Sequence, residues 1–588
     1  MSGTYVRRAI RLGLLFGVIA VSISAIGMVQ SFNERDIING VLTLGQLLLF
    51  VNPIIAGYLA FTIATESPAV TDSVDSLGNT DQPGASNDLP KALGSGLIAG
   101  FFTGLPLVGL IILSVAWPNI RGALVNVTPG LIDILTFGLG TVTGSVVLVI
   151  VMAVLGMLGA LFHLMPEKFE RPILVGIVAT LTFGLFADIF RNILQGFTPR
   201  PVIRLFFGSE GIKPLTAAII FVIAAGANVW WNRQGRERYQ RRFSVTREQS
   251  PRSRRITGIL LIALILAMPW ILGIYLTNIV DQVGLYILMG LGLNIVVGYA
   301  GLLDLGYVAF FAIGAYVMGL ITSTGDLGLG LSFWIALPVS IAAAATAGIL
   351  LGVPVLRMRG DYLAIVTLGF GEIIRVLVAS DLLKPIIGGA QGIIRIGTPG
   401  IFGLDLFKGQ HAQQHFYYLI VAGVALAIFV SSRLRDARLG RQWMALREDE
   451  DVAEAMGINL VKTKLLAFTF GAAFGGLAGG IFASRLNSIF PNSFALLISI
   501  NVLCLIIVGG MGSIPGVIVG ALVLVGLPEL LTEFNEYRLM IYGIVLVATM
   551  LLRPEGLWPS PIRRRELHAD AEEAAREGIM HEEVHDLM

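Results

Sequence analysis

Long apolar runs, separated by short polar stretches, recur along the whole chain. Each run is about 20 residues long, the length that an α-helix needs to cross a lipid bilayer. The runs lack the weak alternation over roughly ten residues that is typical of a membrane β-barrel strand. In the first part of the chain they predict six membrane spans, at residues 9–29, 37–64, 92–117, 131–162, 172–191 and 215–231.

The second part of the chain predicts about ten further spans, counted from its apolar runs. Their alternation places three arginine-bearing loops on one side, and such loops are typical of the cytoplasmic face. The glycine-rich loop at 380–414 is then expected on the outer side, where it could meet a delivering protein or bound cargo. These spans are 256–279, 285–297, 308–322, 333–356, 363–379, 416–430, 465–484, 495–508, 516–530 and 537–552.

Composition supports an all-α, polytopic helical membrane protein. The chain has 588 residues, of which 55% are hydrophobic and 14% are charged, so it has too little polar surface for a soluble globule. The 70 glycines suit close helix packing in lipid. The single cysteine, Cys504, excludes an intrachain disulfide, and the histidines show no zinc-binding spacing, so we expect no metal site.

One apolar stretch, residues 285–322, is too long to be a single span. As one helix it would extend about 57 Å, whereas the bilayer core is roughly 30 Å thick. An interrupted backbone at that depth must be buried in protein or line a cavity. Asp304 is then either the N-cap of the following helix, which we favour, or an acid in a transport pathway. The residues that mark this break are Gly298, Gly301, Asp304 and Gly306.

A second glycine-rich break follows residue 508 and predicts a tight cytoplasmic turn close to the charged loop described next. Its marker residues are Gly509, Gly510, Gly512 and Pro515.

Two opposite charges, Glu372 and Arg375, lie three residues apart in an apolar helix. At this spacing they can neutralise each other inside the bundle. We favour structural pairing, with a role in gating as the alternative.

The most highly charged stretch, residues 440–468, lies between two predicted spans. Good helix formers predict one helix from Arg441 to Met456, which ends at a left-handed Gly457. A solvated connector is the simplest interpretation of such a stretch. The alternative is a docking helix, with Trp443, Leu446 and Met456 as its apolar contacts. Its candidate residues are Gly440, Arg441, Trp443, Arg447, Glu448, Glu450, Ala453, Glu454 and Gly457.

The pattern G-R-x-W-x-A-L-R-E-x-E-x-x-A-E-A-x-G-I in this stretch resembles the ATPase-docking loop of ABC-importer permeases. It is most similar to the LivM type, which serves branched-chain amino acids. Other stretches agree with this family in the same order, so the resemblance covers about residues 256–558. They are residues 292–316, 357–375, 388–393 and 508–531.

The resemblance implies a permease bundle of about ten helices that forms the translocation pathway. Its implied partners are two ABC ATPase subunits, a second permease of the same superfamily and an extracytoplasmic substrate-binding protein. ATP would be bound by the partner subunits, and the chain itself would need no cofactor. Leucine, isoleucine and valine are the implied cargo, with urea or short amides as alternatives. The implied location is a prokaryotic plasma (inner) membrane.

The resemblance divides the chain into four predicted parts. Residues 1–232 form a membrane bundle of unknown role, with about six extra transmembrane helices and no permease signature. Residues 233–255 are a basic cytoplasmic linker that could lie on anionic lipid, and nucleic-acid binding is not expected of so short a patch. Residues 256–558 are the permease domain, and 559–588 a charged cytoplasmic tail.

An enzyme is not expected, because the chain has no phosphate-binding loop, nucleophile elbow or HExxH motif. An ion-coupled secondary transporter remains an alternative, with Asp304, Glu372 and Arg375 as coupling charges. Inverted internal repeats would favour it, and the sequence does not show them.

Overall fold

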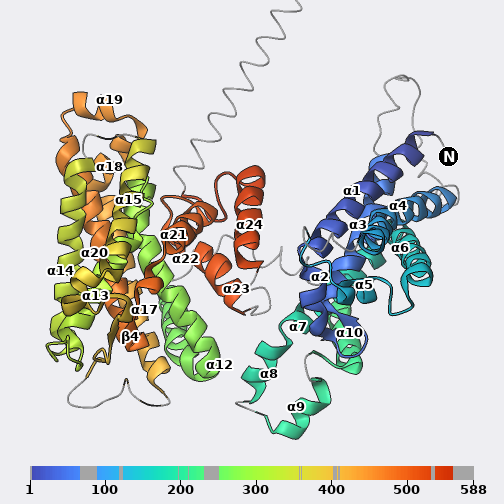
Figure 1. The fold of residues 1–588 in the computed structure, drawn as a ribbon, viewed down its shortest axis with the longest axis horizontal. Coiled ribbons are helices and arrows are strands. Elements are labelled where there is room, and N and C mark those ends of the chain that lie inside the picture. The colour runs from blue at the N-terminus through green and yellow to red at the C-terminus, as the bar shows by residue number, and fades with distance from the viewer. Residues whose placement is uncertain are drawn as a thin grey trace, which may run out of the picture. The chain divides into compact units, whose positions relative to one another are not determined.

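The computed structural model describes most of the chain, and the described part is almost entirely helical, which confirms the all-α prediction (Figure 1). The loop 66–88, residues 233–250 of the predicted linker, Arg357 and Arg359, and the tail from 561 onward lie outside it. The described residues are 3–65, 89–117, 124–195, 198–208, 211–230, 251–355, 358, 360–400, 407, 409, 411–530 and 537–560.

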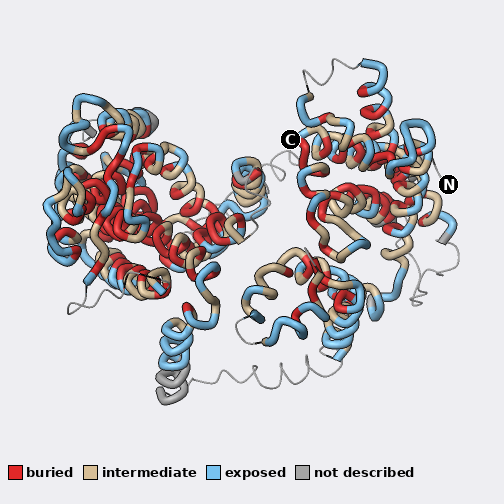
Figure 2. The backbone as a smooth tube through the Cα atoms, turned by 60° about the horizontal axis from the view of Figure 1, so that its bottom comes forward, coloured by how far each residue is buried: buried red, intermediate tan, exposed pale blue. Residues whose placement is uncertain are grey.

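Ten described helices are long and apolar enough to cross a membrane, or eleven if one bent pair counts as a span. Four shorter apolar helices correspond to further predicted spans. The chain divides into two compact units, Met1–Arg255 and Ile256–Met588. In Figure 2 the buried residues concentrate in the interior of each unit.

The first unit is built around four long helices that pack side by side: α1 (Gly3–Ala25), α3 (Leu44–Thr65), α4 (Leu89–Ala116) and α6 (Thr141–His163). Glycine allows their close approach. A Cβ atom on Gly57 of α3 would collide with the carbonyl of Gly156 on α6.

Three of the six predicted spans in this unit have the wrong limits. Residues 37–43 are not helical, because α2 (Met28–Ser31) and a 3₁₀ turn (Phe32–Glu34) lead into a hairpin. Its strands are β1 (Asp36–Ile38) and β2 (Leu42–Thr43), with Asp36 opposite Thr43. The predicted span 131–162 is divided into α5 (Pro129–Leu135) and α6, because Phe137, Gly138 and Gly140 have positive φ.

The third wrong limit concerns the span predicted at 172–191. α7 (Glu167–Leu185) packs along α10 (Pro214–Trp230), but α8 (Ala187–Gln195) bends away from α7 by 63°. The short helix α9 (Arg200–Phe206) follows.

The second unit has a tightly packed centre formed by α13 (Val308–Thr322), α14 (Phe333–Val355) and α20 (Leu460–Leu486). A Cβ atom on Gly479 of α20 would collide with the carbonyl of Phe311 on α13. The unit also contains α15 (Asp361–Ala379), α16 (Lys384–Ile387), α17 (Ala412–Asp436), α18 (Arg438–Glu448), α19 (Glu450–Ala455), α21 (Leu496–Gly509), α22 (Ile514–Ala521), the π-helix Leu522–Gly526, α23 (Leu527–Leu530) and α24 (Arg538–Leu552).

Short irregular elements complete one end of this unit. β3 (Ile393–Ile394) pairs antiparallel with β4 (Ser488–Ile489), so the loop after α15 is joined to the end of α20. The 3₁₀ turns there are Asp381–Leu383, Gly389–Gln391 and Pro491–Phe494.

α12 (Pro251–Leu293) opens the second unit, and it is interrupted at Gly273, where φ is 74° and ψ is −179°. The turn predicted between residues 279 and 285 is wrong, because this stretch is helical. The first half of α12 exposes large apolar side chains, including Ile259 at 66% and Leu260 at 64%. Such a surface suits lipid rather than water.

Candidate functional site

The predicted break in residues 285–322 is present and is buried in protein. α12 continues into a π-helix, η4 (Asn294–Tyr299), after which Gly301 has a φ of +70°. All residues of η4 are buried. π-Helices are rare and often occur at functional sites. The Asn294 side chain accepts a hydrogen bond from the backbone N–H of Gly512 at 2.8 Å, so this break contacts the second glycine-rich turn.

Asp304 does not cap the helix that follows it, so the favoured prediction is wrong. Its Oδ1 accepts from the N–H of Gly306 at 2.9 Å and closes a tight turn. The N-cap of α13 is Tyr307, which makes no side-chain cap. Instead, the N–H of Val308 donates to Ser499 Oγ on α21 at 2.9 Å.

Neighbouring helices therefore satisfy the free backbone groups of the break. The N–H of Leu305 donates to Thr367 Oγ1 on α15 at 3.0 Å. A Cβ atom on Gly306 would collide with the carbonyl of Thr367, so this position has no room for a side chain. The break is a point where η4, α13, α15 and α21 meet.

Replacing a glycine of this break is expected to impair transport more than Cys504→Ala does. Gly306→Leu forces α15 away, and Gly301→Leu forces a side chain into a left-handed backbone beside Arg447. Overpacking of this kind costs about 1–3 kcal/mol. Cys504→Ala only trims a half-buried atom. Uptake should be compared at matched membrane abundance, and equal uptake in all three variants would contradict a functional break.

The second glycine-rich break forms the predicted tight turn between α21 and α22. Gly510 and Gly512 have φ values of 120° and 77°. Ser513 caps α22 by accepting from the N–H of Gly516 at 3.1 Å, and Pro515 lies in its first turn. Trp558 N–H donates to the carbonyl of Gly509 at 2.9 Å, so the segment after α24 is bound to this turn.

The charged stretch forms two helices, α18 and α19, and the prediction of one helix is wrong. Asp449 has an extended backbone, with φ −156° and ψ 119°, and caps α19. Its Oδ1 accepts from the N–H groups of Asp451 and Val452 at 2.8 and 3.0 Å. Aspartate competes well for such caps and so divides the helix. The predicted left-handed end at Gly457 is confirmed by its φ of +85°.

α18 is held firmly against the bundle. Trp443 is fully buried and its Nε1 donates to the carbonyl of Thr463 at 2.9 Å. Arg447 Nη1 donates to the carbonyl of Gly298 in η4 at 2.9 Å. Lys464 Nζ pairs with Glu450 Oε1 at 2.7 Å. The end of α18 is therefore connected directly to the broken helix.

The predicted apolar contacts of this loop divide into two groups. Trp443 and Leu446 are buried and attach the loop to its own unit, so their prediction as partner contacts is wrong. Met456 is 79% exposed and Val452 is 59% exposed. With the exposed Glu454 they form a surface that we call the tip, at one extremity of the second unit (Figure 1). Of the other candidates, Arg441, Glu448 and Gly457 are exposed, Arg447 and Glu450 are half-buried, and Gly440 and Ala453 are buried.

The predicted pair Glu372–Arg375 forms, with Arg375 Nε at 2.9 and 3.0 Å from the two carboxylate oxygens. The prediction that the pair lies inside the bundle is wrong. The two side chains are 42% and 34% exposed, on a face of α15 that also exposes Ile373.

One buried charge pair was not predicted from the sequence. Arg485 Nε lies 3.5 Å from Asp281 Oδ2, and their side chains are 5% and 0% exposed. Arg485 Nη2 also donates to the side chain of Asn278 at 2.5 Å. The signal was present, because an acidic residue within a long apolar run marks a functional or structural site.

The glycine-rich loop after α15 borders a cavity of about 670 Å³ at the β3–β4 end of the unit. Charged residues of both signs line it: Asp326, Asp381, Lys384 and Arg395. α20 runs from the charged stretch of α18 and α19 to this end, and its 27 residues span about 40 Å. The cavity and the tip are thus at opposite ends of α20.

Broken helices packed inside a helical bundle, with the exposed tip at one end, suit a membrane transport permease. The chain belongs to the branched-chain amino acid permease family: residues 275–550 match the family described as "Branched-chain amino acid transport system / permease component". This match lies within the second unit.

Relatives from bacteria and an archaeon agree. The chain is 43% identical over 318 residues to the high-affinity branched-chain amino acid transport system permease protein LivM of Escherichia coli (strain K12), which covers 51% of this chain and 73% of that protein. It is 24% identical to the probable LivM permease of Methanocaldococcus jannaschii, over 47% of this chain and 91% of that protein. The chain is 25% identical to the LivH permease of E. coli, and that alignment covers 47% of this chain and 92% of LivH. No solved structure matches.

Proposed function

We propose that this chain is a permease subunit of an ATP-driven importer for leucine, isoleucine and valine. The observation that carries this proposal is the 43% identity to a branched-chain amino acid permease over 73% of that protein. ATP is bound by partner ATPases, because the chain has no phosphate-binding loop of its own. The location that suits such a system is a prokaryotic inner membrane.

The tip is the surface that receives an ATPase. It presents Val452 and Met456 one helical turn apart, with Glu454 beside them. Movement of the tip reaches the broken helix by a short path, because Arg447 joins α18 to Gly298. At the other end of α20, the cavity beside β3 and β4 faces a substrate-binding protein.

A second permease covers the outward face of α15. A charged pair exposed to hydrocarbon is costly, so Glu372 and Arg375 favour contact with protein at this face. The same face exposes Ile365 at 65% and Val376 at 54%. The partners of the complex are therefore two ATPases, a second permease and a binding protein.

Purification of the native complex, followed by reconstitution, tests this function. Two ATPase chains and a second permease are expected to co-purify. Labelled leucine should enter vesicles only with ATP, and excess isoleucine or valine should suppress its uptake, whereas urea and acetamide should not. Uptake that follows an ion gradient without ATP would reject the proposal in favour of secondary transport. Suppression of leucine uptake by urea, and not by isoleucine or valine, would indicate that urea is the cargo.

A further inference from the structure

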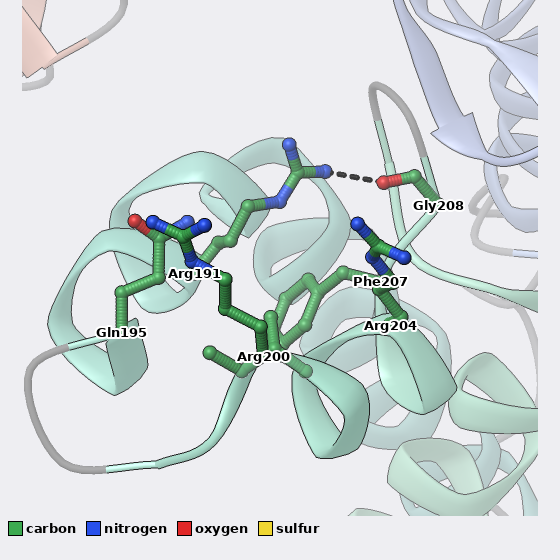
Figure 3. A pocket seen from close by; sticks show the side chains of 7 residues that line it. Arg191, Gln195, Arg200, Arg204, Phe207 and Gly208 are labelled. Carbon is green, nitrogen blue, oxygen red and sulfur yellow. Dashed lines mark hydrogen bonds between the residues drawn. The ribbon is translucent and has the colours of Figure 1, made fainter.

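The first unit, which lies outside the family match, contains a pocket of about 400 Å³ lined by three arginines. Arg191 comes from α8, and Arg200 and Arg204 come from α9. Figure 3 shows these side chains around one opening, with Gln195 beside them. Ile203 and Phe207 contribute the apolar part of the lining.

Arg191 is fixed in place by its own contacts. Its Nη2 donates to the carbonyl of Gly208 at 2.6 Å, and its Nη1 lies 3.6 Å from Asp188 Oδ1. The same carboxylate is 3.4 Å from Arg35 Nη2. One aspartate is therefore shared by two arginines.

Arg200 and Arg204 are exposed, one helical turn apart, and make no ion pair within the part of the chain that the structure describes. Like charges at this spacing repel each other. An anion bound between them removes that repulsion. Guanidinium groups bind phosphate with paired hydrogen bonds, and the Gln195 amide can donate one more.

The same short helices also expose apolar side chains, Leu194 three residues after Arg191 on α8, and Val202 and Leu205 on the side of α9 that faces away from Arg200 and Arg204. Leu194 is 38% exposed, Val202 44% and Leu205 61%. The pocket follows the end of α7, which packs along the apolar helix α10, and α8 bends away from α7 by 63°. Cationic and apolar groups at the end of an apolar helix pair are typical of the headgroup region of a membrane.

We propose that this pocket binds the phosphate of an anionic phospholipid, with the lipid chains against Leu194 and the apolar lining of Ile203 and Phe207. A soluble anion would use the arginines but not these apolar side chains. Lipid binding gives the first unit a role in holding the chain in its membrane, separate from the transport proposed for the second unit.

The experiment uses the full chain in nanodiscs of equal parts phosphatidylcholine and phosphatidylglycerol. Native mass spectrometry then measures which lipids remain bound to the chain after it is released from the nanodiscs. Arg200→Gln/Arg204→Gln should reduce retained phosphatidylglycerol by about fivefold for each arginine removed. The matched control is Arg7→Gln/Arg11→Gln, which removes two exposed arginines one turn apart on α1. The control should retain phosphatidylglycerol as the unmodified chain does.

A second measurement needs no variant. Arginine-selective modification of the unmodified chain should be slower at Arg200 and Arg204 in the mixed nanodiscs than in pure phosphatidylcholine. If modification of Arg11 slows equally, the effect is a general attraction of anionic lipid to arginine, and the proposal of a specific lipid site is overturned. Unchanged retention in the pocket variant would overturn it as well. Protection by inorganic phosphate without retained phosphatidylglycerol would assign the pocket to a soluble anion instead.

Discussion

Glu454→Lys is expected to reduce ATP-driven leucine uptake to background while the chain still inserts into the membrane. Glu454 is exposed at the tip, so the substitution leaves the internal packing of the second unit unchanged. Charge reversal at an interface places like charges together and costs several kcal/mol, of order 2–5. That cost is enough to release an ATPase bound there.

The measurement is ATP turnover and leucine uptake together, in vesicles that contain the purified partners, with and without binding protein. Glu34→Lys is the matched control, because it reverses an exposed acidic residue in the first unit. Unchanged uptake and unchanged stimulation of ATP turnover in Glu454→Lys would reject the tip as an ATPase contact.

Arg447→Gln is expected to leave ATPase binding intact while weakening the link between the tip and the broken helix. It removes the 2.9 Å hydrogen bond from α18 to the carbonyl of Gly298 but does not alter the tip. ATPases should therefore still bind and turn over ATP, with less leucine imported per ATP. Loss of ATPase binding in this variant would mean that Arg447 only supports the shape of the loop.

Hydropathy predicted where most helices lie, though not all of their limits, because lipid imposes a simple rule of length and apolarity on each span. It also located the break in residues 285–322, since a run that is too long must be interrupted, and glycines marked both this break and the one after residue 508. It did not predict that Asp449 divides the charged stretch into α18 and α19. That division depends on a local competition, in which the aspartate side chain caps α19 rather than remaining in one helix.

Contacts between distant residues are not specified by local sequence patterns. The link from Arg447 to Gly298 joins residues 149 positions apart, and no local pattern specifies it. The orientation of α15 is a similar case. The spacing of Glu372 and Arg375 predicts their pairing, but which face of the helix points outward depends on how the whole bundle packs.

Removing one charge of the Asp281–Arg485 pair is expected to destabilise the chain by about 3–5 kcal/mol, because the other charge is left buried and uncompensated. Asp281→Asn and Arg485→Gln are the two single variants. Thermal unfolding of the purified chain in detergent measures the effect. The exposed pair offers the control, since Glu372→Gln should change thermal stability little in detergent.

The double variant Asp281→Leu/Arg485→Met should recover most of that loss. The distance between Arg485 Nε and Asp281 Oδ2 is long, at 3.5 Å, and neither Asp281 oxygen makes a hydrogen bond to another described residue. The attraction within the pair therefore compensates poorly for the water that both charges lose, and apolar replacements of similar size can match or exceed its stability. A stable double variant that no longer transports leucine would assign the pair to the transport cycle. A double variant less stable than either single one would contradict this account of the pair, because the charges would then contribute net stability to the fold.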